Sequence, residues 1–157
     1  MFLSLSWQGG STGMEVLFFS ENEDYWEVLK VLQQLRPQYA LTSLAQQVEK
    51  QIQQGYNLVY VKSGSDILAA SGFVVGEKLA WGKYIYVDDL VTNELTGSDG
   101  VGKYVIDWLK EYAQQQGCEQ IHLDSGVQRF GAHRFYLRER FTIASHHFSL
   151  TDVSSRG

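Results

Sequence analysis

Apolar residues recur along this chain with two spacings, one typical of helices and one typical of strands. Apolar stripes three to four residues apart predict helices over residues 25–35, 41–52, 100–116 and 130–139. A capping box over residues 20–23 is expected to start the first helix, and Pro37, the only proline, to end it. Gly117 is expected to mark the end of the third helix.

Shorter apolar runs bounded by turn residues predict strands. They cover residues 15–19, 58–61, 67–75, 81–92 and 119–124, with a final strand or hairpin over 141–150. Turns over residues 63–66 and 76–78 predict antiparallel neighbours, because short connections join antiparallel strands. The long connection through helix 100–116 predicts that strand 119–124 runs parallel to strand 81–92. The expected fold class is mixed α+β, with a largely antiparallel sheet flanked by helices.

A chain of 157 residues is most simply one domain. Residues 1–13 are interpreted as an N-terminal extension because a short apolar stretch is followed by a glycine-rich linker. Residues 14–150 form the predicted domain, and residues 151–157 a C-terminal tail. The apolar stretch is too short to span a membrane and lacks the features of a signal peptide.

Composition and charge narrow the classes of function. The content of 44% apolar and 13% aromatic residues fits a folded protein and not a disordered one. A net charge of −5 offers no basic footprint for nucleic acid or an anionic membrane. Cys118 is the only cysteine, which excludes an internal disulfide and favours a cytoplasmic setting. The four histidines fall on different predicted elements without a metal-ligand spacing, so no metal site is expected.

The candidate chemistry lies where strand 81–92 leads through a loop into the helix at Gly100. Gly100 and Gly102 lack side chains, and a helix start presents unpaired backbone N–H groups and a positive dipole end, which together suit an anion such as phosphate. Gly-x-Gly at a helix start also occurs as a simple tight turn, so the spacing leaves both interpretations open. The pattern fits neither a Rossmann fingerprint nor a P-loop.

Two segments together resemble a known family. The first, residues 89–102, keeps a strand-to-loop-to-helix spacing similar to the family motif Gln/Arg-x-x-Gly-x-Gly/Ala. The second, residues 132–141, reads Ala-His-Arg-Phe-Tyr-Leu-Arg-Glu-Arg-Phe and is similar to the motif Ala-x-x-(Leu/Phe)-Tyr-x-x-x-Gly-Phe. From Met14 to about Leu150 the chain resembles the Gcn5-related N-acetyltransferase (GNAT) superfamily, in a bacterial small-molecule or peptide acetyltransferase-like branch.

The resemblance implies acetyl-coenzyme A as co-substrate, held where two parallel strands splay apart, here residues 84–92 and 120–124. The pantetheine arm is expected on the backbone of Leu90, Val91 and Thr92. The pyrophosphate is expected on the loop and helix start, at Gly97, Ser98, Asp99, Gly100, Val101, Gly102 and Lys103. Ser125 and Arg129 are the remaining residues expected to bind the co-substrate. Ser125 is set aside as a nucleophile because it lacks a Gly-x-Ser-x-Gly context.

The resemblance also implies catalytic roles. Tyr136 matches the tyrosine that donates a proton to the departing thiolate, although a core aromatic at helical spacing is the alternative. Asp88 is the candidate base or anchor for the amine, with structural hydrogen bonding as its alternative. Adjacent strand residues point to opposite faces, so at most one of Asp88 and Asp89 is expected to face the wedge.

The chain departs from the family pattern at four positions. Relatives usually carry arginine or glutamine at Gly97, often a basic residue at Asp99, often asparagine at Arg129, and glycine at Arg140. A carboxylate beside a pyrophosphate predicts weak binding of the co-substrate, which Lys103 partly offsets. The expected function is transfer of an acetyl group to a primary amine of a small molecule or peptide, by direct attack in a ternary complex. The alternative is a catalytically weakened binding or regulatory module. A homodimer through residues 141–150 is left open.

Overall fold

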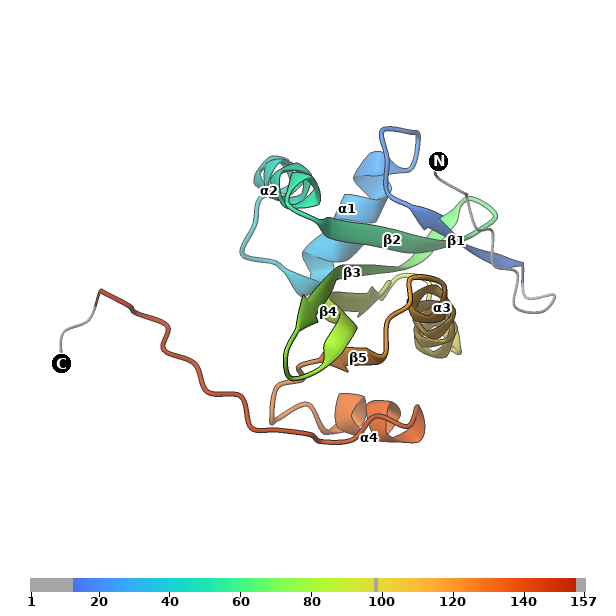
Figure 1. Ribbon diagram of the computed structural model, residues 1–157. Coiled ribbons are helices and arrows are strands. Elements are labelled where there is room, and N and C mark those ends of the chain that lie inside the picture. The colour runs from blue at the N-terminus through green and yellow to red at the C-terminus, as the bar shows by residue number, and fades with distance from the viewer. Residues whose placement is uncertain (1–12, 98, 155–157) are drawn as a thin grey trace. The chain divides into compact units, whose positions relative to one another are not determined.

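The computed structural model describes residues 13–97 and 99–154 (Figure 1). Most of the predicted N-terminal extension, Ser98 and the last three residues of the predicted tail lie outside the described residues. The chain divides into two compact units, one ending at Leu123 and one beginning at Asp124, and each is described by itself.

The first unit is built on a sheet of five strands in the order β1-β2-β3-β4-β5. The strands are β1 (Met14–Phe18), β2 (Tyr56–Ser63), β3 (Asp66–Lys78), β4 (Gly82–Thr92) and β5 (Gln120–Leu123). The first four pair antiparallel with their neighbours, and β5 pairs parallel with β4. The predicted α+β class, the largely antiparallel sheet and the parallel last strand are confirmed.

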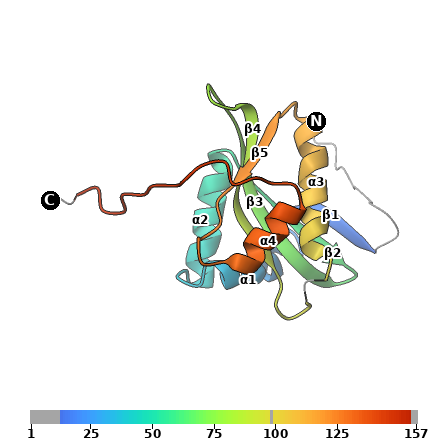
Figure 2. The same ribbon diagram turned by 90° about the horizontal axis from the view of Figure 1, so that it is seen from below.

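Three helices cover the two faces of this sheet (Figure 2). Helices α1 (Tyr25–Leu35) and α2 (Leu41–Gln53) lie on one face, and α3 (Val101–Gln115) lies on the other. The apolar stripes of α1 and α2 meet Tyr60 and Ala70 of the sheet in one buried core cluster. On the opposite face, Phe73 of β3 packs edge-on against Tyr112 of α3, with ring centroids 5.5 Å apart. Strand β3 therefore contributes side chains to the cores on both faces of the sheet.

Two predicted local features of this unit are wrong. The capping box predicted over residues 20–23 does not start α1. The N-cap is Asp24, and its side chain makes no capping hydrogen bond. The Asp24 carboxylate accepts hydrogen bonds from Tyr60 at 2.8 Å and from Lys62 at 3.0 Å instead, which draws it away from the helix start. The turn predicted at residues 76–78 also fails, because β3 continues to Lys78. Gly76 is needed within the strand since the Tyr84 hydroxyl would lie 2.5 Å from a Cβ there.

The second unit contains α4 (Phe130–Arg138), as predicted. The helix ends in a Schellman motif: the Arg140 N–H donates to the Leu137 carbonyl at 3.1 Å, and the Phe141 N–H donates to the Tyr136 carbonyl at 3.0 Å. The final strand or hairpin predicted over residues 141–150 is wrong, because no regular strand forms there. The side chains of Ile143 and Phe148 are exposed, so the loose apolar alternation has no buried face to occupy.

Candidate functional site

The pairing of the two parallel strands stops halfway along β4, because β5 ends at Leu123. Strand β5 pairs with β4 from Tyr84 opposite Gln120 to Val87 opposite Leu123. Strand β4 then continues to Thr92, still paired with β3 on its other side. Within residues 13–97 and 99–154, no strand covers the β5-facing edge of β4 beyond Val87. Leu90, Val91 and Thr92, the predicted backbone partners of the co-substrate, all lie on this open stretch.

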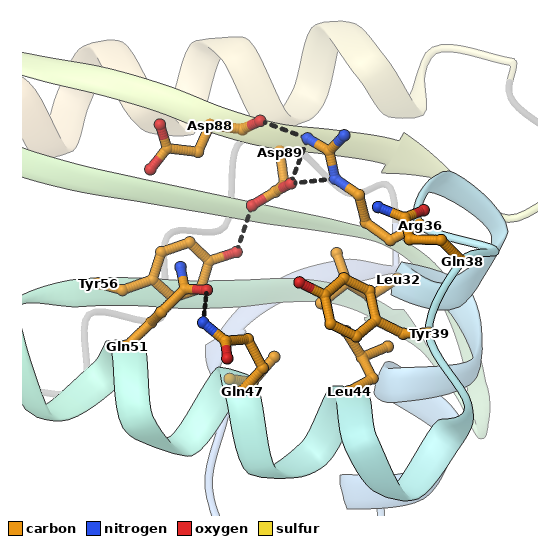
Figure 3. A pocket seen from close by; sticks show the side chains of 11 residues that line it. Leu32, Arg36, Gln38, Tyr39, Leu44, Gln47, Gln51, Tyr56, Asp88 and Asp89 are labelled. Carbon is orange, nitrogen blue, oxygen red and sulfur yellow. Dashed lines mark hydrogen bonds and ion pairs between the residues drawn. The ribbon is translucent and has the colours of Figure 1, made fainter. Parts of the chain in front are cut away.

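A β-bulge in β4 lies directly after the last residue that pairs with β5. Gly72 pairs with Asp89, but the next residue of β3, Phe73, pairs with Val87, so Asp88 is the extra residue. A bulge bends its strand and breaks the strict alternation of side chains. Asp88 and Asp89 consequently both line one cavity (Figure 3). The expectation that at most one of these two carboxylates faces the wedge assumed regular alternation, which the bulge interrupts. It stays a prediction, because this cavity is lined from α1 and α2 and not from β5.

The bulge is held by Arg36, which follows the last residue of α1. Its Nη2 lies 2.7 Å from Asp89 Oδ1 and donates to the Asp88 carbonyl at 3.1 Å, while its Nε donates to the same Asp89 oxygen at 2.9 Å. Figure 3 shows the guanidinium facing the bulge from the α1 side. One side chain thereby fixes both the backbone of Asp88 and the carboxylate of Asp89.

A second contact reaches Asp89 from the opposite side. The Tyr56 hydroxyl of β2 donates to Asp89 Oδ2 at 2.7 Å, and burial raises the pKa of this phenol far above its usual range. The ring lies over Gly72, where an added Cβ would be 1.6 Å from the hydroxyl oxygen. Gly72 must therefore lack a side chain for Tyr56 to reach the carboxylate.

Asp88 and Asp89 have different environments. The Asp89 side chain is 12% exposed and engaged by Arg36 and Tyr56. Asp88 is exposed as a residue, and its carboxylate accepts no hydrogen bond from the described residues. Partial burial raises the pKa of Asp88, the Asp89 charge raises it further, and Arg36 lowers it. Asp88 is thus a carboxylate with a raised pKa and free oxygens, as a group that accepts a proton requires.

The loop between β4 and α3 is organised by Asn93, a buried side chain that sequence reasoning missed. Its Nδ2 donates to the Ile67 carbonyl at 2.8 Å, and its Oδ1 accepts from the Leu95 N–H and from Gln34 Nε2, each at 3.0 Å. Gln34 also accepts the Glu94 N–H at 3.0 Å. Helix α1 therefore fixes the start of this loop. Only the strand-ending position of Asn93 could have signalled this role.

The start of α3 has the geometry expected of an anion site. Its N-cap, Gly100, has a φ of 73°, in the left-handed region that favours glycine. The first helical bond runs from the Tyr104 N–H to the Gly100 carbonyl at 3.1 Å, so the amides of Val101 and Gly102 precede it. Added Cβ atoms at Gly97 and Gly100 would meet nothing within 4 Å, which leaves open space beside this backbone.

Charges at this helix start are mixed. Asp99 is exposed next to the N-cap, and Lys103 Nζ lies 3.0 Å from Asp107 Oδ2 one turn further on. Lys103 is therefore partly neutralised within the helix, which weakens the compensation predicted for it. Ser98, the remaining predicted contact of this loop, lies outside the described residues.

Three predicted site residues belong to the second unit. Tyr136 lies on α4, packs against Phe141 with ring centroids 5.8 Å apart, and has its pKa raised by burial and lowered by the Arg129 charge. Arg129 is the N-cap of α4. The Ser125 hydroxyl is buried and has no hydrogen-bond partner within the part of the chain that the structure describes. Phe141 and Arg129 thus set the local environment of Tyr136.

The described residues contain no group of three histidine, cysteine, aspartate or glutamate side chains placed to hold a metal ion. None of the described helices has both the length and the apolar character needed to cross a membrane.

Comparison with known proteins gives a consistent assignment. The model of the acetyltransferase (GNAT) family matches residues 21–141. An uncharacterized N-acetyltransferase, YhdJ, of Bacillus subtilis (strain 168) is 30% identical over 131 residues, covering 82% of this chain and 92% of that protein. An aminoalkylphosphonate N-acetyltransferase of Salmonella typhimurium is 34% identical over 65 residues, 41% of each chain. The crystal structure of a transcriptional regulator from Bacillus halodurans C-125 has a TM-score of 0.74 at 18% identity, covering 88% of this chain and 99% of that one, and shares the fold.

Proposed function

The chain belongs to the acetyltransferase (GNAT) family, and from this premise we propose that it moves an acetyl group from acetyl-coenzyme A to a primary amine. The amine attacks directly while both substrates are bound, since no activated covalent nucleophile stands out among the described residues. Acetyl-coenzyme A supplies the activated acetyl group when bound.

The observation that supports this proposal most directly is the open edge of β4 next to the start of α3. The backbone from Leu90 to Thr92 is free on the β5-facing side to hydrogen-bond an extended pantetheine arm, as an added strand would. The loop from Gly97 and the first amides of α3 suit a pyrophosphate, because the helix start carries unpaired donors and a positive dipole end. Asp99 opposes this binding and reduces its strength.

Asp88 is the proposed base. A primary ammonium has a reference pKa near 10.4, so the amine must lose a proton before it attacks. The Asp88 carboxylate projects from the bulge at the end of the paired region, without a hydrogen-bond partner among the described residues. Its raised pKa improves its proton affinity relative to an ordinary carboxylate. Ser125 and Arg129 remain proposed contacts of the co-substrate.

Tyr136 is the proposed donor of the proton that the departing thiolate takes up. Its raised pKa keeps the phenol protonated through the neutral range. The alternative role, a structural aromatic that packs on Phe141, predicts a change in stability without a specific loss of turnover.

The test combines binding and turnover. Acetyl-coenzyme A should raise the melting temperature of the protein, because a ligand that binds only the folded state stabilises it. Thiol release with a panel of primary amines then measures transfer. Tyr136→Phe should lower turnover about a hundredfold, whereas Tyr25→Phe, a control at an exposed hydrogen bond to Glu49, should not. A Tyr136→Phe enzyme with full activity removes the tyrosine from the mechanism.

A second function, a weakened binding or regulatory module, is favoured by one specific observation. The loop before α3 carries glycine and a carboxylate at positions 97 and 99, where a cationic side chain would assist phosphate binding. Absence of any thermal shift at millimolar acetyl-coenzyme A would favour this module over the enzyme.

A further inference from the structure

A cavity of about 310 Å³ lies between α1, α2 and the bulge of β4 (Figure 3). Leu32, Leu44 and Val48 form its apolar part. The volume is at the lower end of the range for small-molecule sites, so the cavity suits a compact ligand. Because Asp88 and Asp89 are part of the lining, a ligand here reaches the proposed base.

Charge in the cavity is unbalanced. Asp88 and Asp89 contribute two carboxylates, and Arg36 is the one cation among the described lining residues. Two nitrogens of Arg36 are committed to Asp89 and to the Asp88 carbonyl. The cavity therefore keeps one net negative charge when both carboxylates are ionised. An ammonium is attracted to it, whereas a phosphate, phosphonate or carboxylate on the same ligand is repelled.

The rest of the lining is neutral and polar. Gln38, Tyr39, Gln47 and Gln51 surround the side of the cavity away from the sheet. Gln47 Nε2 donates to Gln51 Oε1 at 2.9 Å. This leaves the side-chain amide oxygen of Gln47 and the amide nitrogen of Gln51 for a ligand. The Tyr39 hydroxyl makes no hydrogen bond to the described residues. Such a mixture of donors and acceptors matches hydroxyl groups, which both donate and accept.

We propose that this cavity is the acceptor site and that it selects a compact, cationic amine whose remaining polar groups are neutral hydroxyls, an amino alcohol or an amino sugar, over amines that carry an anionic group. The inference rests on the proposed acetyl transfer and names the acceptor class for it. The ammonium lies at Asp88, and the hydroxyls bind the glutamine amides and Tyr39.

The test uses pairs of amines that differ only by a phosphate: 2-aminoethanol with its O-phosphate, and glucosamine with its 6-phosphate. We expect kcat/KM for acetyl transfer to be at least about tenfold higher for the unphosphorylated member of each pair. Equal or faster transfer to the phosphorylated members overturns the inference while leaving the acetyltransferase function intact.

A charge-changing variant locates the selectivity in the cavity. Gln51→Lys places a second cation in the lining and should shrink or invert the ratio within each pair. Gln53→Lys makes the same change on the exposed side of α2, outside the lining, and should leave the ratio unchanged. Tyr39→Phe should raise KM for glucosamine several-fold without changing KM for ethylamine, which has no hydroxyl. Identical ratios in both lysine variants overturn the assignment of this cavity.

Calorimetric titration of the same amines into the protein with coenzyme A separates this inference from the proposed function. Binding of glucosamine that Gln51→Lys weakens, without acetyl transfer, supports the cavity assignment and counts against the enzyme. Absence of binding by every amine of the panel overturns the inference.

Discussion

Arg36 Nη2 lies 2.7 Å from Asp89 Oδ1 and also donates to the carbonyl of Asp88, the bulged residue of β4. A β-bulge leaves backbone groups without their usual ladder partners. The guanidinium satisfies the Asp88 carbonyl and neutralises the neighbouring carboxylate at once. The residue that follows α1 thereby stabilises the bulge of β4, just beyond the last residue that pairs with β5.

Replacing Arg36 should change both stability and the pH profile. Arg36→Gln leaves the largely buried Asp89 carboxylate with fewer donors, which should lower the free energy of unfolding by about 1–3 kcal/mol. Because the Arg36 charge lowers the pKa of Asp88, its loss raises that pKa. The acid limb of the kcat/KM profile should move to higher pH.

The control for this change is Lys30→Gln. Lys30 also lies on α1 and forms an ion pair with Glu27, but both side chains are more than half exposed. Exposed pairs contribute little, so this variant should match the wild type in both measurements. An Arg36→Gln enzyme with an unshifted acid limb would argue against Asp88 as the base.

Gly72 should not tolerate a side chain. A Cβ there would be 1.6 Å from the Tyr56 hydroxyl oxygen, so Gly72→Ala must displace the ring and break its bond to Asp89. We expect a loss of about 3 kcal/mol in the free energy of unfolding, measured by urea denaturation. In a Tyr56→Ala background the same substitution should cost less than about 1 kcal/mol. Gly131→Ala adds a methyl group in open space on α4 and should leave the fold at least as stable, which makes it the control for added bulk. If Gly72→Ala cost the same free energy of unfolding with and without Tyr56→Ala, the predicted clash with the Tyr56 ring would be contradicted.

Asp88→Asn separates activity from stability. The folded protein raises the pKa of Asp88 above its usual value, so activity that needs the carboxylate should fall as pH drops through this raised pKa. The same shift means that ionised Asp88 destabilises the fold, and stability is lost as pH rises through the raised pKa. Asp88→Asn should therefore lose most turnover but unfold at a slightly higher temperature at neutral pH. Lower stability combined with full activity would contradict both roles.

Most of the fold could be predicted because apolar periodicity and helix-end signals act within a single helix or strand. The apolar stripe of α3 and Gly117 after it specify a helix and its end without reference to the rest of the chain. The bulge at Asp88 depends instead on the register between β4 and β3, and therefore on Gly72 and the ring of Tyr56 above it. Alternation along a single strand cannot reveal such a shift.

The candidate site likewise contains residues that a sequence motif predicts and residues that only contacts between distant elements reveal. The loop and the start of α3 were predicted as positions in a motif, and the structure adds that Gly100 there is left-handed. Arg36 and Asn93 were missed because each acts through contacts between elements distant in the sequence. The wrong final strand over residues 141–150 shows the converse limit: an alternating pattern specifies a strand only where one of its faces is buried, and Ile143 and Phe148 are exposed.

Asp99 should limit the affinity for acetyl-coenzyme A. Removing its charge with Asp99→Asn should lower the dissociation constant roughly three- to tenfold at low salt, the effect of one like charge a few ångströms away in a solvated site. Added salt should reduce the difference between the two proteins. Glu111→Gln, an exposed change further along α3, is the control for net charge. Equal dissociation constants for the wild type and Asp99→Asn would show that Asp99 does not contact the diphosphate.

Arg140 at the end of α4 has the left-handed conformation that a glycine, Gly117, has at the end of α3. Both α3 and α4 end in Schellman motifs: Gly117 and Arg140 are the left-handed residues, with φ of 72° and 73°. A side chain in this region costs roughly 1–2 kcal/mol relative to the right-handed one, and glycine avoids most of this cost. Arg140→Gly should therefore raise the free energy of unfolding by about 1 kcal/mol, measured by denaturant titration. Gly117→Arg should lower it by a similar amount, and a destabilised Arg140→Gly variant would show that the arginine side chain makes a compensating contact.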